Sequence, residues 1–496
     1  MYAIANKNVT SMPELNWKFD NSYARLPEAF FSRLEPAPAK EPNLVIFNHS
    51  LASEMGLDAE NIPESRLAEL FVGNTLPKGA TPIAQAYAGH QFGHFTVLGD
   101  GRALVLGEHI APDGLRYDIQ FKGSGRTPYS RGGDGRAAIG PMLREYIISE
   151  AMAALGVPTT RSLAVVTTGE PVYRENILQG AILTRVAKSH LRVGTFEYAA
   201  YRRDLQGLSN LVDYAIDRHF SRFNSKENSA LLLLKGVMES QIGLVVDWLR
   251  VGFIHGVMNT DNMTISGETI DYGPCAFMDV YDPQTAFSSV DHGRRYAFGN
   301  QPIITRWNLV RFAEALLPLI HSDVDKAVNI AEEHISAFDN IFKSQWTSMM
   351  RKKLGFFGEN PEDVAIAEDF LSWMQTNKAD YTNTFRLLCA GSPPMVGEHM
   401  DSAFSDWYAR WEARRIQQSE TIDESLELMR TNNPVYIPRN HKVEDALNLA
   451  SEKGDLTLLH SLLNVIADPY IERNQHESYT APHPPDYGRY QTFCGT

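Results

Sequence analysis

The residues that decide the fold are HGVMNTDN at positions 255–262 and DYG at positions 271–273. Asn262 and Asp271 lie nine residues apart, across a turn predicted at Ser266-Gly267, so both side chains can face one cation. Amide and carboxylate oxygens are ligands that hold Mg²⁺ against phosphate groups. Any one of these residues alone would indicate only a surface turn. Together, after a long apolar segment, they predict a site for a divalent cation and a nucleotide.

The same pattern is typical of kinase-like folds, in which an Asn closes the catalytic loop and an Asp-x-Gly follows on a short hairpin. Kinases carry their catalytic Asp two residues after the His, and that position is Val257 here. A carboxylate appears instead at Asp261, directly before Asn262. Two hypotheses follow. Either the protein is catalytically inactive, or Asp261 accepts the proton of an attacking hydroxyl from a shifted position.

A lysine and a glutamate upstream match the ion pair that orients phosphates in kinases. Lys122 ends the strand-like run YDIQFK, and Glu145 lies on the helix that Gly140-Pro141 opens (MLREYIISEAMAAL). Either residue alone would be interpreted as a solvated surface charge. Their place in the chain before the 255–273 motif favours the ion pair.

Segments rich in glycine and arginine flank Lys122. Glycines let backbone N–H groups approach phosphate oxygens, and arginine binds phosphate in a bidentate manner. The segments are GDGR at 99–102, GSGR at 123–126 and RGGDGR at 131–136. Kinases place their glycine loop before the lysine strand, whereas the denser run here follows it. Arg185 and Arg192 are further candidates for a phosphate clamp, or else ordinary surface arginines.

The composition indicates a soluble globular protein of 496 residues, with 43% hydrophobic and 21% charged side chains. The net charge of −14 opposes broad attraction to nucleic acid or anionic membrane, so a phosphate site must concentrate positive charge locally. The apolar stretches are shorter than the ~20 residues that a spanning helix requires. The first residues show no signal-peptide pattern, and three cysteines argue against a disulfide-built scaffold. We therefore expect a cytoplasmic protein with no nucleic-acid or membrane partner.

Four parts are expected along the chain. Residues 1–80, rich in Pro and Asn, should wrap irregularly around a later core, and residues 81–204 should form a β-rich lobe with one helix. Residues 205–304 should form a helical lobe that carries the catalytic loop and the metal site, and residues 305–496 a further helical region. This order predicts a two-lobed α+β protein with a kinase-like fold and a cleft between the lobes.

Hydrophobic periodicity and turn residues predict the individual elements. They are a hairpin of 102–110 with 117–121, strands at 162–168 and 181–186 with a turn at 169–171 after the first, a buried helix at 230–251, a short hairpin within 263–273, and helical segments at 307–320 and 443–467.

Beyond these local patterns, the chain resembles the selenoprotein O family over essentially its full length. The resemblance is carried by YAGHQFG at 87–93, LGDGRA at 98–103, QFKGSGRTPYSRGGDGRA at 120–137, HGVMNTDN at 255–262 and DYGPCAF at 271–277. Members of this family are protein adenylyltransferases with a pseudokinase fold. The resemblance implies that ATP binds flipped relative to ordinary kinases, so that AMP is transferred to Ser, Thr or Tyr hydroxyls of proteins, some of them redox-related. Transfer of UMP from UTP, with Mn²⁺, is also associated with bacterial relatives.

Carried over motif by motif, the resemblance implies that Asp261 is the base and that Asn262 and Asp271 hold Mg²⁺ or Mn²⁺. It implies that Lys122 contacts phosphate and pairs with Glu145. The remaining nucleotide contacts would be Gly99, Gly101, Arg102, Asp134, Gly135, Arg185, Arg192 and Asp271 itself.

Two cysteines complete the candidate site. Cys275 follows the DYG motif by two residues, and Cys494 lies three positions from the end. By themselves they are a buried small hydrophobe and a free tail thiol, or a pair that forms a reversible disulfide near the active site. Some family members carry selenocysteine near the C-terminus. The resemblance makes Cys494 its counterpart and implies the pairing with Cys275.

Overall fold

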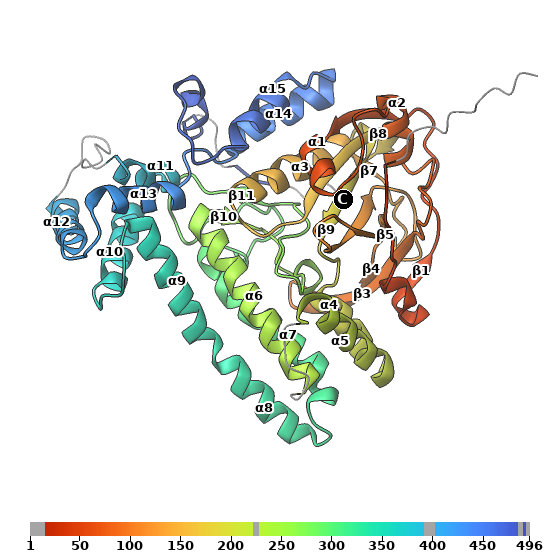
Figure 1. The fold of residues 1–496 in the computed structure, drawn as a ribbon, viewed down its shortest axis with the longest axis horizontal. Helices are drawn as coiled ribbons and strands as arrows, with labels where there is room; N and C mark the ends of the chain where they lie inside the picture. The colour runs from red at the N-terminus through yellow and green to blue at the C-terminus, as the bar shows by residue number, and fades with distance from the viewer. Residues whose placement is uncertain (1–14, 222–227, 391–401, 485–489, 493–496) are drawn as a thin grey trace, which may run out of the picture.

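An antiparallel β-sheet forms one side of the molecule in the computed structural model, which describes residues 15–221, 228–390, 402–484 and 490–492 (Figure 1). Within these residues the nine strands follow the order β1-β3-β5-β6-β9-β8-β2, with β4 paired to β3 and β7 to β9. The strands are β1 (Phe31–Arg33), β2 (Asn43–Phe47), β3 (Ile83–Gln91), β4 (His94–Gly99), β5 (Ala103–Ile110), β6 (Arg116–Lys122), β7 (Ala137–Ala138), β8 (Arg161–Tyr173) and β9 (Ile177–Ala187).

Both faces of the sheet are buried. Successive side chains of a strand point to opposite faces, so one strand contributes to two cores. On β9, Leu183 joins the core that α3 (Ile139–Ala154) contributes to, whereas its neighbour Ile182 joins the core under α1 (His49–Glu54) and α2 (Glu64–Phe71). The middle of the strand, Ala181 to Leu183, is therefore a continuous apolar run rather than an alternating one.

The helical part begins with α4 (Val193–Tyr201), α5 (Leu205–His219) and α6 (Ser229–Val251). The short pair β10 (Phe253–Ile254) and β11 (Ala276–Phe277) then brackets the 255–273 motif. Among the described residues, α6 is the one helix long and apolar enough to cross a membrane, but 67% of its apolar stretch is buried inside the protein. It packs against α5, α7 and α9 as a core helix.

Further helices occupy the rest of the chain; in Figure 1, α7 lies beside α6, α8 is at the bottom, α9 to α13 are on the left, and α14 and α15 are at the top. They are α7 (Gln301–Ile320), α8 (Val324–Ser336), α9 (Phe338–Leu354), α10 (Asp363–Thr376), α11 (Tyr381–Leu388), α12 (Ser402–Ile416), α13 (Ile422–Asn432), α14 (Asn440–Lys453) and α15 (Thr457–Ile466).

These elements confirm the predicted α+β class. The hairpin of β5 and β6, the helix α3 and the buried helix α6 also lie within two residues of their predicted bounds. The predicted helical segment at 443–467 is two helices, because Gly454 takes a left-handed φ of +66° and ends α14.

Three local predictions were wrong. The N-terminal 80 residues do more than wrap, since β1 and β2 lie at the two ends of the sheet. The residues 169–171 do not end a strand, because β8 continues through a register shift between Thr167 and Pro171. The segments on either side of Gly267 do not pair as a hairpin. The Thr264 hydroxyl bonds both backbone groups of Glu268, while Thr264 bridges to Arg192.

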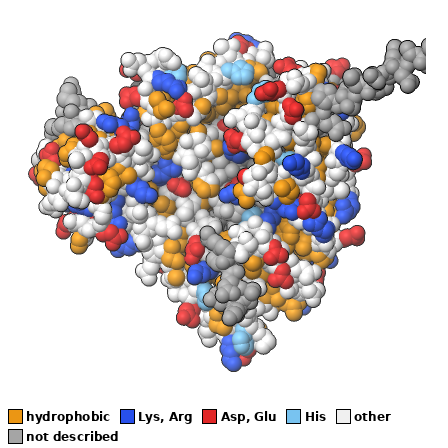
Figure 2. Space-filling view, viewed as in Figure 1, with side chains coloured by type: hydrophobic (Ala, Val, Ile, Leu, Met, Phe, Trp, Pro, Cys, Tyr) orange, Lys and Arg blue, Asp and Glu red, His pale blue; other side chains and the backbone are white. Residues whose placement is uncertain are grey.

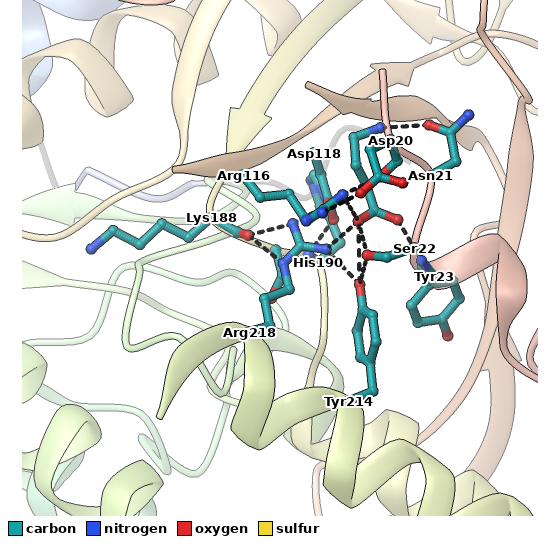
Figure 3. Close-up of polar contacts among 12 residues, drawn as sticks. Asp20, Asn21, Ser22, Tyr23, Arg116, Asp118, Lys188, His190, Tyr214 and Arg218 are labelled. Carbon is teal, nitrogen blue, oxygen red and sulfur yellow. Dashed lines mark hydrogen bonds and ion pairs between the residues drawn. The ribbon is translucent and has the colours of Figure 1, made fainter. Parts of the chain in front are cut away.

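A buried network of charges joins the sheet to α5 (Figure 3). Arg218 donates to Glu108 on β5 at 2.9 Å, to Asp118 on β6 at 2.6 Å and to the carbonyl of Lys188 at 2.6 Å. His190 donates its backbone N–H to Asp118 at 2.8 Å. Asp118 lies on the same strand, β6, as Lys122, and Lys188 and His190 lie in the connection that leads to Arg192. The network therefore fixes two segments that carry site residues.

The other side of that connection is held by Glu268, which accepts the backbone N–H of Lys188 at 2.9 Å. Burial raises the pKa of Glu268 to about 7, although Lys188 opposes the shift. A carboxyl whose pKa is higher in the folded state binds its proton more tightly there. The associated stability is complete below the unfolded pKa and is lost as pH rises through about 7.

We therefore expect Glu268→Gln to flatten the pH dependence of stability. Between pH 5 and pH 8 the free energy of unfolding of the wild type should fall by about 2–3 kcal/mol more than that of the variant. Urea denaturation at several pH values measures this difference. Glu452→Gln, at an exposed position of α14, is the control and should behave like the wild type. Equal slopes for Glu268→Gln and wild type would contradict the assignment.

Candidate active site

A cavity of roughly 370 Å³ lies between the sheet and the 255–273 motif. It is lined by all of the predicted nucleotide, base and metal residues, namely Gly99, Gly101, Arg102, Lys122, Asp134, Gly135, Arg185, Arg192, Asp261, Asn262 and Asp271. Seven basic and four acidic side chains lie in the lining, so the cavity is positive although the whole chain is not. Elsewhere, side chains of both signs are mixed over the face in Figure 2. The cavity therefore concentrates positive charge, as a phosphate site in an acidic protein requires.

Asp271 is the centre of the charge arrangement. Its Oδ1 accepts from Lys122 at 3.2 Å and from Arg185 at 2.5 Å, and its Oδ2 accepts from Arg192 at 2.7 Å. Burial raises its pKa, but Arg185, Lys122 and Arg192 outweigh burial and hold the pKa well below its usual range. The carboxylate is therefore ionised, and its side chain remains 22% exposed to the cavity. Its φ of +60° is a strained conformation for a non-glycine residue, often found at functional sites.

Glu145 lies behind the lining, with 1% of its surface exposed. It accepts from Lys122 at 2.7 Å through Oε2, and from the Arg185 Nε through Oε1. The predicted ion pair of Lys122 and Glu145 is thus present in the structure, and Arg185 extends it. These contacts fix the two cations at the cavity wall.

Asp261 faces the same cavity from the other side. It is 8% exposed, and its Oδ1 has no hydrogen-bond partner among the residues that the structure describes. Burial raises its pKa to about 6, against an opposing effect of Arg192. A buried carboxylate with an unpartnered oxygen beside a cavity can accept a proton there.

The loop around Asp261 is ordered by its own polar groups. His255 is fully buried and bonds the carbonyl of Ile270 through Nε2 at 2.8 Å, which ties the loop to the segment that carries Asp271. Asn262 donates its amide Nδ2 to the carbonyl of Val257 at 3.0 Å. Its Oδ1 is therefore the side-chain atom left for a cation. Val257, at the position of the kinase base, lines the cavity but carries no titratable group.

Two of the predicted glycines are required by close packing. A Cβ on Gly99 would lie 2.4 Å from the ring of Tyr129, and one on Gly135 would lie 2.1 Å from the carbonyl oxygen of Gly125. Gly135 also has a φ of +68°. Any side chain at these positions would displace the loop that forms the cavity rim.

The predicted disulfide can be assessed at one end only. Cys275 is fully buried, and burial raises the pKa of its thiol to about 12, which disfavours the thiolate. Cys494 lies outside the described residues. The last described residue, Thr492, donates through Oγ1 to the carbonyl of Pro274 at 2.7 Å and through its backbone N–H to Phe287 at 2.8 Å. Thr492 therefore contacts the residue next to Cys275.

The sequence did not single out several other residues that line the cavity. Arg174 bonds Asp134 at 2.8 Å from the tip of the β8–β9 hairpin, and Arg192 stacks over Tyr87 at 4.6 Å from the ring centroid. Tyr87 lies within the YAGHQFG motif, which was a usable signal. Arg174 lies in an ordinary polar turn, and no sequence pattern marked it as a site residue.

Comparison with known proteins identifies the family of the chain. The family model described as "Protein adenylyltransferase SelO" matches residues 13–467. A protein nucleotidyltransferase YdiU of Nitrosococcus oceani is 58% identical over 483 residues, which cover 97% of this chain and 98% of the relative. The YdiU proteins of Brevibacillus brevis (57% identical; 97% and 98% covered) and Syntrophotalea carbinolica (54%; 99% and 100%) are similarly close. The chain therefore belongs to the SelO family of protein adenylyltransferases and is an enzyme of the nucleotidyltransferase class.

Proposed function

We propose that this chain transfers AMP from ATP to Ser, Thr or Tyr hydroxyls of other proteins, with Asp261 as the base. The observation that carries the proposal is the position of the buried Asp261 carboxyl in the lining of a cavity rich in Lys and Arg. The family description and the names of the relatives, which specify protein nucleotidyl transfer, support the reaction class and the protein acceptor.

In the proposed reaction, the acceptor oxygen forms a bond to the α-phosphorus of ATP. The bond from that phosphorus to the oxygen bridging to the β-phosphate breaks, and pyrophosphate leaves. The hydroxyl proton passes to Asp261. Lys122, Arg185 and Arg192, now bonded to Asp271, are the cations available to stabilise negative charge on the leaving group. Binding of ATP in a flipped orientation would put the γ-phosphate deepest among these cations.

Asn262 and Asp271 would hold the divalent metal, Mg²⁺ or Mn²⁺. The donor set fits, because Asn262 offers its amide oxygen and Asp271 an ionised carboxylate. Within the described parts of the chain, no three His, Cys, Asp or Glu side chains are grouped to hold a metal unaided. That suits Mg²⁺, which proteins bind through one or two side chains together with substrate phosphates. When bound, the ion would neutralise phosphate charge.

We also propose that the architecture is that of a kinase-like fold with two lobes. The supporting features are the strand lysine paired to the helix glutamate, and the order in which the sheet, α6 and the 255–273 motif follow one another. The expected cytoplasmic location remains a prediction.

The proposal is tested by the mass gained by an acceptor protein, such as casein or the enzyme itself, incubated with the chain, Mg²⁺ or Mn²⁺, and either ATP or UTP. An AMP adduct is the expected product. A UMP adduct with UTP and no adduct with ATP would favour uridylyl transfer. A phosphate adduct would favour a kinase. Binding of nucleotide with no adduct of any kind would favour an inactive pseudokinase.

We further propose that Cys275 and Cys494 form a reversible disulfide. Support comes from Thr492, two residues before Cys494, which bonds the carbonyl of Pro274. The two thiols would lose two electrons and two protons to an added oxidant, oxidised glutathione, as the S–S bond forms. Digestion without reduction should then yield one peptide that joins the two cysteines, absent from Cys494→Ser. Two free thiols after oxidation would contradict the pairing.

A further inference from the structure

Strand β3 lies directly on the loop that carries Asp261. A Cβ built on Gly89 would be 2.2 Å from the Oδ1 of Asp261, so only a glycine fits between the strand and the carboxylate. Helix α4 lies equally close to the strand and also to the loop, since a Cβ on Gly194 would be 1.9 Å from the carbonyl oxygen of Ala88 and 3.5 Å from the Cα of Asp261. The strand, the helix and the loop therefore meet without intervening side chains at this point.

Three polar side chains fasten these elements to one another. The Thr260 hydroxyl accepts the backbone N–H of His90 on β3 at 2.7 Å and donates to Glu197 Oε2 on α4 at 2.5 Å. The second oxygen of Glu197 bonds the Nδ1 of His90 at 2.5 Å. Thr260 is fully buried and Glu197 is 5% exposed, so these bonds are shielded from water.

A second contact holds the neighbouring residue of the loop. Asn259 Oδ1 accepts the backbone N–H of Phe92 at 3.0 Å and the hydroxyl of Tyr296 at 2.6 Å. The two residues before Asp261 are thus bonded to the end of β3, whereas the Oδ1 of Asp261 has no such bond among the described residues. This arrangement fixes the backbone immediately before Asp261, whose carboxyl lies in the cavity lining.

We propose that Thr260, Glu197 and His90 are positioning residues for Asp261, an inference that rests on the proposed role of Asp261 as the base. None of the three lines the cavity or is a proposed metal ligand, and they act through the backbone at Thr260. Catalysis depends on placing the base within hydrogen-bond reach of the acceptor, and a displacement of about 1 Å can cost about 10²-fold in rate. We expect ATP binding to depend on Lys122 and Arg185 of the sheet rather than on this contact.

The test compares Thr260→Val, which keeps the shape of the side chain but removes its hydroxyl, with Thr260→Ser, which retains the hydroxyl. Thr260→Val should lower kcat for AMP transfer by about 10- to 100-fold and change KM for ATP by less than about twofold. Thr260→Ser should stay within about threefold of the wild type. The control is Ser425→Ala, because Ser425 is also fully buried and its hydroxyl also accepts one bond, from Arg415, and donates another, to Gly355.

Ser425→Ala should lower thermal stability comparably but leave kcat unchanged. If Thr260→Val leaves kcat at the wild-type level, or if Ser425→Ala lowers kcat as much, the positioning role is overturned. Hydrogen exchange of the amides in 88–92 and 257–263 decides the same point without any reaction. Exchange should accelerate in Thr260→Val alone. Unchanged exchange would overturn the inference, whereas a wild type that forms no AMP adduct would overturn only the proposed function.

Discussion

Asp261→Asn is expected to reduce AMP transfer by about 10³-fold while leaving ATP affinity within about threefold. Asparagine has the same shape but cannot accept the hydroxyl proton. Because burial disfavours the charged carboxylate and raises its pKa to about 6, the neutral amide should not destabilise the fold. The loss of activity should therefore appear with an unchanged or higher free energy of unfolding. Steady-state transfer rates, ATP titration calorimetry and urea denaturation measure the three quantities.

Asp247→Asn on α6 is the matched control, since it makes the same chemical change at a side chain that is 32% exposed and does not line the cavity. It should transfer AMP at the wild-type rate. If Asp261→Asn kept more than about a tenth of the wild-type rate, Asp261 would not be the base. The reaction would then need another proton acceptor.

The second large effect is expected at Glu145, which neutralises Lys122 and Arg185 in a buried position. Glu145→Leu would leave Lys122 and Arg185 with Asp271 as the carboxylate they still share, and the excess of buried positive charge should lower the free energy of unfolding by about 3–5 kcal/mol. Transfer should also be lost, because Lys122 would no longer be held at the cavity wall. Urea denaturation and the transfer assay, run on the same preparations, measure both effects.

The double variant Glu145→Leu with Lys122→Met separates the two effects. Removing one of the cations that Glu145 neutralises should restore most of the stability, since Arg185 and Arg192 retain Asp271 as their partner. Activity should stay absent, because the phosphate contact of Lys122 is gone. A double variant as unstable as Glu145→Leu alone would show that the ion pair does not account for the stability of this region.

Local patterns predicted much of the fold. The residues of α3 carry a proline near the start and a glycine after the end, and α6 is a long apolar run, so both helices were located within two residues. The bounds of the strands were harder to predict where residues typical of turns lie inside a strand. Gly169 and Pro171 mark a register shift within β8 rather than its end, which is why the hairpin that carries Arg174 was not expected.

The candidate site was predicted through two different routes. Spacing and ligand chemistry pointed to Asp261, Asn262 and Asp271, whereas the roles of Arg185 and Arg192 came mainly from the family resemblance. The contacts of His90 with Glu197 and Thr260 could not be predicted, because these residues are far apart in the sequence. Glu197 lies 107 residues after His90, and Thr260 lies 170 residues after it. Periodicity reports which face of an element is buried, and it carries no information on which distant polar groups meet there.

Transfer of AMP, rather than of phosphate, from ATP to a protein hydroxyl is the reaction that we propose for this chain. It is tested most directly by incubating the wild-type chain and an acceptor protein with ATP labelled at either the α- or the γ-phosphorus. We predict protein-bound label from α-labelled ATP only, with the γ-label recovered in pyrophosphate, and no protein-bound label with Asp261→Asn. Protein-bound label from γ-labelled ATP alone would contradict the account.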